Sequence, residues 1–102
     1  MEKRIEYIEQ MENNLNDCME ILRKYEDILA QFRDVQKKIS ALSEYYGSAQ
    51  WHQDFEDSEN GRLPADLQCG VLTEDAVWNL LTDNKQLTVE MLETAVQILK
   101  NT

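Results

Sequence analysis

Residues 8–46 decide how this chain folds, and they read IEQMENNLNDCMEILRKYEDILAQFRDVQKKISALSEYY. Apolar side chains recur there in alternating steps of three and four, at Ile8, Met11, Leu15, Cys18, Leu22, Tyr25, Leu29 and Phe32. That spacing places them on one stripe of an α-helix. Beyond Phe32 the stripe is predicted to pass through Val35, with one step of four shortened to three. The pattern predicts a helix over residues 2–46, which the Asn- and Asp-rich stretch 13–17 could interrupt.

The strong helix breakers all fall in one window of the chain, at Gly47, Gly61, Pro64 and Gly70. Gly47 is placed to end the long helix in a left-handed conformation. Ser48 is a good cap for a short helix over residues 48–57, and the stretch 58–61 is typical of a turn.

A second short helix over residues 64–69 is predicted from Pro64 at its start and Gly70 after its end, with Leu67 facing inward. Thr73 is predicted to cap a last helix over residues 74–100, which has a broad apolar face. The sequence therefore predicts a single all-α domain over residues 1–102. Its architecture is a long antiparallel helical hairpin with one or two short helices at the closed end.

Composition excludes several function classes. The 20 acidic residues outnumber the 10 basic ones and give a net charge of -10, which disfavours direct binding to nucleic acid or to an anionic membrane. No stretch has the length or apolarity of a signal peptide or a membrane span. Cys18 and Cys69 form no CxxC motif and are expected to be reduced and packed inside. We therefore expect a cytoplasmic protein.

Several short blocks follow one another in the second half of the chain. They are YYGS at residues 45–48, DFE at 54–56, LPADL at 63–67 and GVLTEDAV at 70–77. In this order they resemble a family of small, mostly Gram-positive bacterial proteins catalogued as a domain of unknown function. The resemblance covers roughly residues 20–100 and implies a cytoplasmic bacterial protein. It implies no activity, cofactor or catalytic residue.

An aromatic cluster is the first candidate site. Tyr45, Tyr46, Trp51 and Phe55 lie within eleven residues, around the end of the long predicted helix. Large rings at such a joint favour a core plug, whereas Tyr and Trp are also enriched at protein interfaces. The cluster is therefore predicted to fill the joint, with a partner pocket as the alternative.

An acidic cluster follows at once, formed by Asp54, Glu56, Asp57 and Glu59. It lacks the glycine that an EF-hand loop needs at its sixth position, so we expect a solvated charge run or a contact surface for a basic partner. His52 stands two residues before Asp54, and residues two apart on a helix do not face each other. A single histidine without a cysteine pair also makes no ordinary zinc site, so neither a metal nor a cofactor is expected.

The start of the long helix is the third candidate. At 1.5 Å per residue, a helix over 2–46 is about 67 Å long and one over 74–100 about 40 Å long. In an antiparallel hairpin the second helix then ends near residues 18–20. Four apolar residues lie beyond that point, namely Ile5, Ile8, Met11 and Leu15. Either this end bends back or frays, or the four residues bind a partner, for which a homodimer is one choice.

The sequence carries no GxSxG, P-loop, GxGxxG or HExxH motif. We therefore predict a non-catalytic helical interaction or structural protein with an unidentified protein partner. One alternative is an acidic decoy that inhibits a basic, nucleic-acid-binding protein. Another is a minor enzyme or metal binder around His52 and the acids at 54–59.

Overall fold

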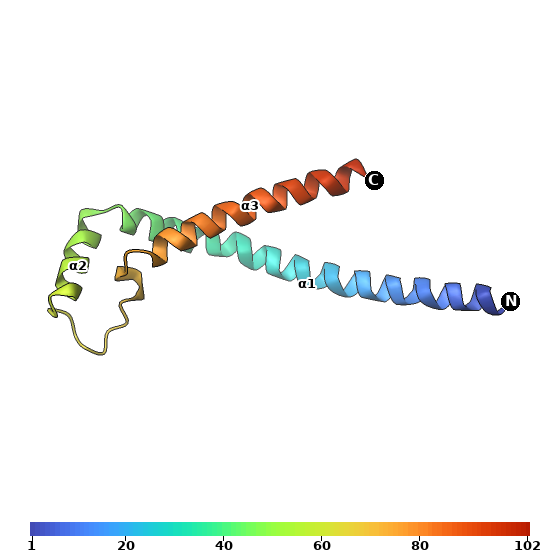
Figure 1. Ribbon diagram of the computed structural model, residues 1–102, viewed down its shortest axis with the longest axis horizontal. Coiled ribbons are helices and arrows are strands. Elements are labelled where there is room, and N and C mark those ends of the chain that lie inside the picture. The colour runs from blue at the N-terminus through green and yellow to red at the C-terminus, as the bar shows by residue number, and fades with distance from the viewer. The chain divides into compact units, whose positions relative to one another are not determined.

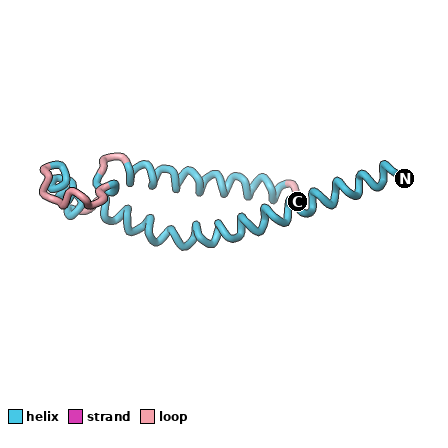
Figure 2. The backbone as a smooth tube through the Cα atoms, turned by 90° about the horizontal axis from the view of Figure 1, so that it is seen from below, coloured by secondary structure: helices cyan, strands magenta, loops and turns pink.

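The computed structural model describes residues 1–102, and every regular element in it is helical. Helix α1 spans Glu2–Tyr46, α2 spans Ala49–Glu59, the 3-10 helix η1 spans Gly70–Leu72, and α3 spans Ala76–Lys100. Figure 1 labels the three α-helices, and Figure 2 shows loops and turns between them and no strand. The prediction of an all-α fold, with short helices between two long ones, is confirmed.

The chain divides into two compact units. Unit 1 comprises Met1–Lys37 and unit 2 comprises Lys38–Thr102. All of unit 1 after Met1 is α1, which continues through the Asn-rich stretch 13–17 without a break. The interruption that the composition of this stretch allows is therefore absent. The apolar residues on both sides of the stretch keep their helical spacing, and this pattern outweighs the low helix propensity of Asn and Asp.

The buried core lies in unit 2. It consists of Trp51 on α2, Leu72 on η1 and Val77 on α3. The end of α1 is tied to the start of α3 in this unit, because the Tyr46 hydroxyl donates a 3.0 Å hydrogen bond to the Glu74 carbonyl oxygen. This bond closes the turned end of the predicted hairpin.

Helix α2 has well-defined caps at both ends. The Ser48 hydroxyl accepts a 3.2 Å hydrogen bond from the Trp51 amide, as predicted for an N-cap. At the other end, the amide of Arg62 donates to the Asp57 carbonyl over 2.8 Å and that of Gly61 to the Ser58 carbonyl over 3.3 Å. Gly61 is left-handed, with φ of 68°, so the helix ends in a Schellman motif.

The predicted left-handed conformation at Gly47 is wrong. Gly61 is the residue with positive φ. The Gly47 amide instead continues the helical pattern by donating to the Ser43 carbonyl over 3.4 Å. The Ser48 hydroxyl then donates to the Tyr45 carbonyl over 2.6 Å. Because Ser48 satisfies a carbonyl at the helix end, no left-handed residue is needed there.

The predicted helix over 64–69 is also wrong. Pro64 supports a single turn, in which its carbonyl accepts the Leu67 amide over 3.1 Å, and Leu67 is exposed rather than facing inward. The helical turn follows later, as η1. Pro64 favours the start of a turn, but nothing in this short segment supplies the apolar face that would hold a helix in place.

The last helix begins at Ala76, two residues later than predicted, and Thr73 does not cap it. The Thr73 hydroxyl donates to the Gly70 carbonyl over 2.9 Å and so closes η1. Asp75 stands at the N-cap of α3 without a side-chain capping bond. The Thr73 hydroxyl, which the sequence predicts as the N-cap of the last helix, is therefore used by η1 instead.

Between Phe32 and the last turn of α1 the half-buried residues are Gln36, Ile39 and Leu42, whereas Val35 keeps 38% of its surface exposed. The step of four that is shortened to three therefore lies between Ile39 and Leu42 rather than at Val35. The predicted passage through Val35 is therefore wrong. A polar residue occupies the stripe position because the geometry of the helix, and not the hydropathy of one residue, determines which side chains share a face.

Candidate interaction surfaces

The aromatic cluster forms a packed joint in unit 2. The Trp51 ring lies parallel to that of Phe55, with centroids 5.1 Å apart. Tyr46 meets Trp51 edge to face, also at 5.1 Å. Trp51 keeps only 7% of its surface exposed, and its indole N–H donates to the Val71 carbonyl over 3.0 Å. Both the apolar face and the polar atom of this tryptophan are therefore satisfied within the unit, which supports a core plug.

The fourth aromatic residue, Tyr45, is linked to the acidic cluster. Its hydroxyl donates a 2.6 Å hydrogen bond to Asp54 Oδ2, and the Gln50 side-chain amide donates to Asp54 Oδ1 over 2.7 Å. The bond to Asp54, together with partial burial and the negative charge of that carboxylate, raises the pKa of Tyr45 to about 12. Tyr45 thus serves as a hydrogen-bond donor that fixes the start of α2.

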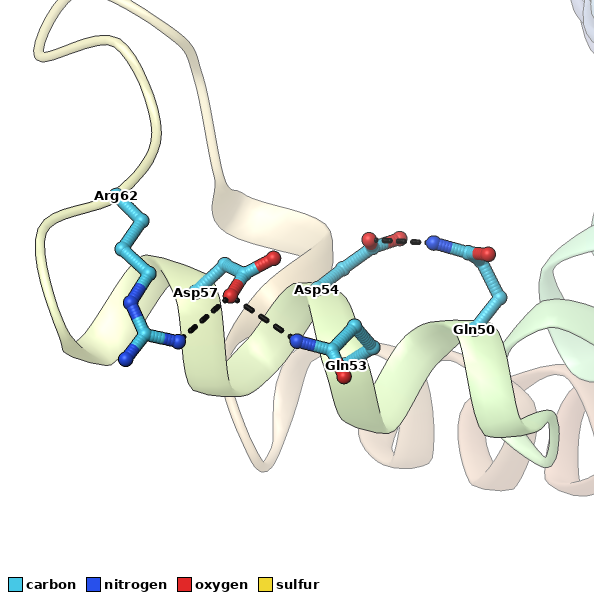
Figure 3. Close-up of polar contacts among 5 residues, drawn as sticks. All are labelled: Gln50, Gln53, Asp54, Asp57 and Arg62. Atoms are coloured by element: carbon cyan, nitrogen blue, oxygen red, sulfur yellow. Dashed lines mark hydrogen bonds and ion pairs between the residues drawn. The ribbon is translucent and has the colours of Figure 1, made fainter.

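Asp57 has a similar structural role at the end of α2. Its Oδ1 accepts from the Gln53 side-chain amide over 3.1 Å and lies 3.3 Å from Arg62 Nη1 (Figure 3). The ion pair spans the same residues as the Schellman motif and reinforces it. Two of the four predicted acids, Asp54 and Asp57, are therefore half-buried and paired within the chain.

The other two acids, Glu56 and Glu59, are exposed, as is His52. The His52 ring contacts Trp51 edge to face with centroids 5.3 Å apart. No group of three or more His, Cys, Asp or Glu side chains is arranged to hold a metal ion. The structure thus separates the predicted acidic cluster into two structural carboxylates and two exposed ones.

The N-terminal candidates, unlike the aromatic cluster, are not packed against other residues of their unit. Unit 1 contains no buried residue, and Ile5, Ile8, Met11 and Leu15 are all exposed. Exposure continues along the stripe, with 52% of Leu15 and 67% of Leu22 accessible. Cys18 is exposed as well, against the expectation that it packs inside. A shallow apolar hollow lies on this face, lined by Asp17, Cys18, Ile21 and Leu22.

Further apolar residues are exposed. On either side of the α1 stripe, where no apolar face is predicted, they are Tyr7, Met19, Ile21 and Ile28. The predicted broad apolar face of α3 is exposed at Leu80, Leu87, Leu92, Ile98 and Leu99, and Trp78, Val89 and Val96 are exposed on the same helix. Their helical spacing is visible in the sequence, but the sequence does not say whether an apolar face is covered. None of the helices combines the length and apolar character that a membrane crossing requires.

Comparison with known proteins identifies the family. The model of the family described as Domain of unknown function (DUF4298) matches residues 8–94. The chain therefore belongs to DUF4298, in agreement with the resemblance to a domain of unknown function. No curated protein and no solved structure is detectably similar to it.

Proposed function

We propose that this DUF4298 protein is a non-catalytic interaction protein that binds a protein partner through the apolar stripe of α1. The observation that carries the proposal is the exposure of the stripe from Ile8 to Tyr25. A contiguous exposed apolar surface of this kind marks an interaction site, since water contact with so many large side chains is unfavourable.

The charge distribution on α1 supports the same function. Between Ile5 and Tyr25 the charged residues lie mainly on the side of the helix opposite the stripe, at Glu6, Glu9, Glu20, Arg23 and Lys24, whereas Asp17 lines the hollow beside the stripe. An apolar face bordered by charges is what a helix needs to bind a groove or another helix. Placement in the bacterial cytoplasm stays a prediction from the sequence, as do the decoy and the metal-binding alternatives.

Site-specific photo-cross-linking tests this function. A photoreactive residue replaces Leu15 on the stripe in the full chain, and Asn13, on the opposite side of the same helix, is replaced in the control. In extract of the producing cell we expect a protein adduct from position 15 and little from position 13. Equal labelling from both positions, or none from either, would contradict a binding role for the stripe.

A further inference from the structure

The exposed part of the stripe is complementary to itself when two copies run in opposite directions. Its residues are Ile8, Met11, Leu15, Cys18, Leu22 and Tyr25, all of them exposed. Their steps along the chain are three, four, three, four and three, which is the same series in both directions. One antiparallel register therefore pairs them all: Leu15 with Cys18 of the second copy, Met11 with Leu22, and Ile8 with Tyr25.

The surroundings of the stripe fit such a pairing. The hollow beside Cys18 and Leu22 lies where this register brings Leu15 and Met11 of the second copy. A side chain from one helix entering a hollow between side chains of the other is the packing mode of coiled coils. Exposed side chains at Tyr7, Met19 and Ile21 widen the apolar face beyond the central seam.

Charge selects the antiparallel direction. Residues 5–22 contain five acidic residues, Glu6, Glu9, Glu12, Asp17 and Glu20, and no basic one. Because these charges lie mainly on the outer side of each helix, they act across a pair only at long range. A parallel pair in register would align the acidic stretch of one copy with the same stretch of the other along its whole length, which is unfavourable. The antiparallel register instead brings Arg23 and Lys24 level with Gln10 and Glu9 of the second copy, so basic residues border the acidic stretch of the other chain.

The exposed apolar surface between Ile5 and Ile28 is large enough for a specific interface between two copies. Ten large apolar residues from Ile5 to Ile28 each keep more than a third of their surface exposed. At roughly 100 Å² each, two copies would remove up to about 2,000 Å² from water, within the range of specific interfaces. The stretch ends where burial begins, because Leu29 and Phe32 are already half-buried.

We propose that residues 5–28 of α1 form an antiparallel coiled coil with the same residues of a second copy of this chain. The proposal rests on the proposed function of the stripe and names its partner. The two-fold axis passes between Asn16 and Asp17, so each copy contributes the same residues to the interface.

Sedimentation velocity on the full chain tests whether the pair forms. We expect a dimer at micromolar concentration. Leu15→Asp is expected to weaken it by about 100-fold, because it buries a carboxylate in the apolar seam. Asn13→Asp, the matched control, adds the same charge to the opposite face and is expected to change the dissociation constant by less than about threefold.

Disulfide trapping tests the direction. In chains that carry Cys18→Ser and Cys69→Ser, one chain receives Ile8→Cys and a second, size-tagged chain receives Tyr25→Cys. The antiparallel pair predicts a mixed disulfide between the two chains under mild oxidation. A parallel pair predicts only disulfides between identical chains, because positions 8 and 25 lie about 25 Å apart along a helix.

The outcomes separate this proposal from the one on which it rests. A mixed disulfide together with a Leu15→Asp-sensitive dimer supports the antiparallel coiled coil, and disulfides between identical chains overturn its direction. A strict monomer at high micromolar concentration overturns self-pairing altogether. If that monomer still forms an adduct with another protein from position 15, the stripe is a binding surface for a different partner and only the proposed function stands.

Discussion

The two units use similar apolar residues to opposite effect. In unit 2, Trp51 packs on Phe55 and Tyr46, and its indole N–H reaches the Val71 carbonyl 20 residues away. In unit 1, Leu15 and Leu22 stand on an equally regular helix and remain exposed. Apolar periodicity therefore shows which side chains share a face, whereas burial depends on whether a second element packs against that face.

The largest effect is expected when the core of unit 2 is opened. Trp51→Ala removes the buried ring and leaves the Val71 carbonyl without its donor, so we expect a loss of about 3–5 kcal/mol in the free energy of unfolding. Trp78→Ala is the matched control, because 60% of Trp78 is exposed, and we expect it to change stability by less than about 0.5 kcal/mol. Urea denaturation followed by circular dichroism measures both. Similar losses for the two variants would mean that burial does not distinguish them.

The contrast is sharpened by a substitution on the stripe of unit 1. Leu15→Asp is expected to leave the unfolding of unit 2 unchanged, since Leu15 is exposed and lies outside that unit. Its expected effect of about 2.7 kcal/mol falls on association instead, which corresponds to the 100-fold weakening given above. Intrinsic fluorescence in urea reports unit 2, because both tryptophans, Trp51 and Trp78, lie in that unit, while sedimentation reports association. A large shift in the fluorescence transition of the isolated monomer would show that the two regions are coupled.

A smaller effect is expected from the polar contact at the start of α2. Tyr45→Phe removes the 2.6 Å hydrogen bond to Asp54, while Gln50 still binds that carboxylate. We expect a loss of about 1 kcal/mol near neutral pH, because the contact is only partly buried.

This contribution depends on pH in a definite direction. The pKa of Tyr45 is about 12 in the folded chain, against 10.0 for an ordinary tyrosine, so the folded state holds the phenol proton more tightly than the unfolded state. The contribution is therefore complete below pH 10 and is lost as the pH rises toward 12. The stability difference between the wild type and Tyr45→Phe should shrink over that interval. A difference that stays constant would show that the hydrogen bond to Asp54 is not its source.

The smallest effect on stability is expected from alanine substitutions at Gly61 and Gly47, which should differ from each other. Gly61→Ala is expected to cost about 1 kcal/mol, because its φ of 68° is unfavourable for a residue with a Cβ, although nothing lies within 4 Å of that atom. Gly47→Ala is expected to be neutral or slightly stabilising, since Gly47 is not left-handed and its added Cβ would lie 3.9 Å from the Ser43 carbonyl oxygen. Thermal melting of both variants tests this. Greater damage at Gly47 than at Gly61 would restore the left-handed cap that the sequence suggests.

Candidate residues differ in how well the sequence placed them. The periodicity of residues 8–32 predicted the helix and its stripe, and the four N-terminal candidates are exposed. The acids of α2 carried no such signal. Gln53 meets Asp57 within α2, whereas Tyr45 and Arg62 reach Asp54 and Asp57 only after the turns before and after α2 have formed.

Short-range rules, then, determined the three α-helices of this protein from its sequence, but they also predicted a helix over residues 64–69 that does not form. Spacings of three and four residues, the Ser48 cap and the glycine at position 61 act within about one turn of helix, so they can be recognised along the chain. The tertiary structure decided the rest. Trp51 finds its acceptor 20 residues away and Tyr46 finds one 28 residues away, and Thr73 closes η1 instead of capping α3. Such choices depend on which groups meet in space, and that is decided by packing across the unit rather than by neighbours in sequence.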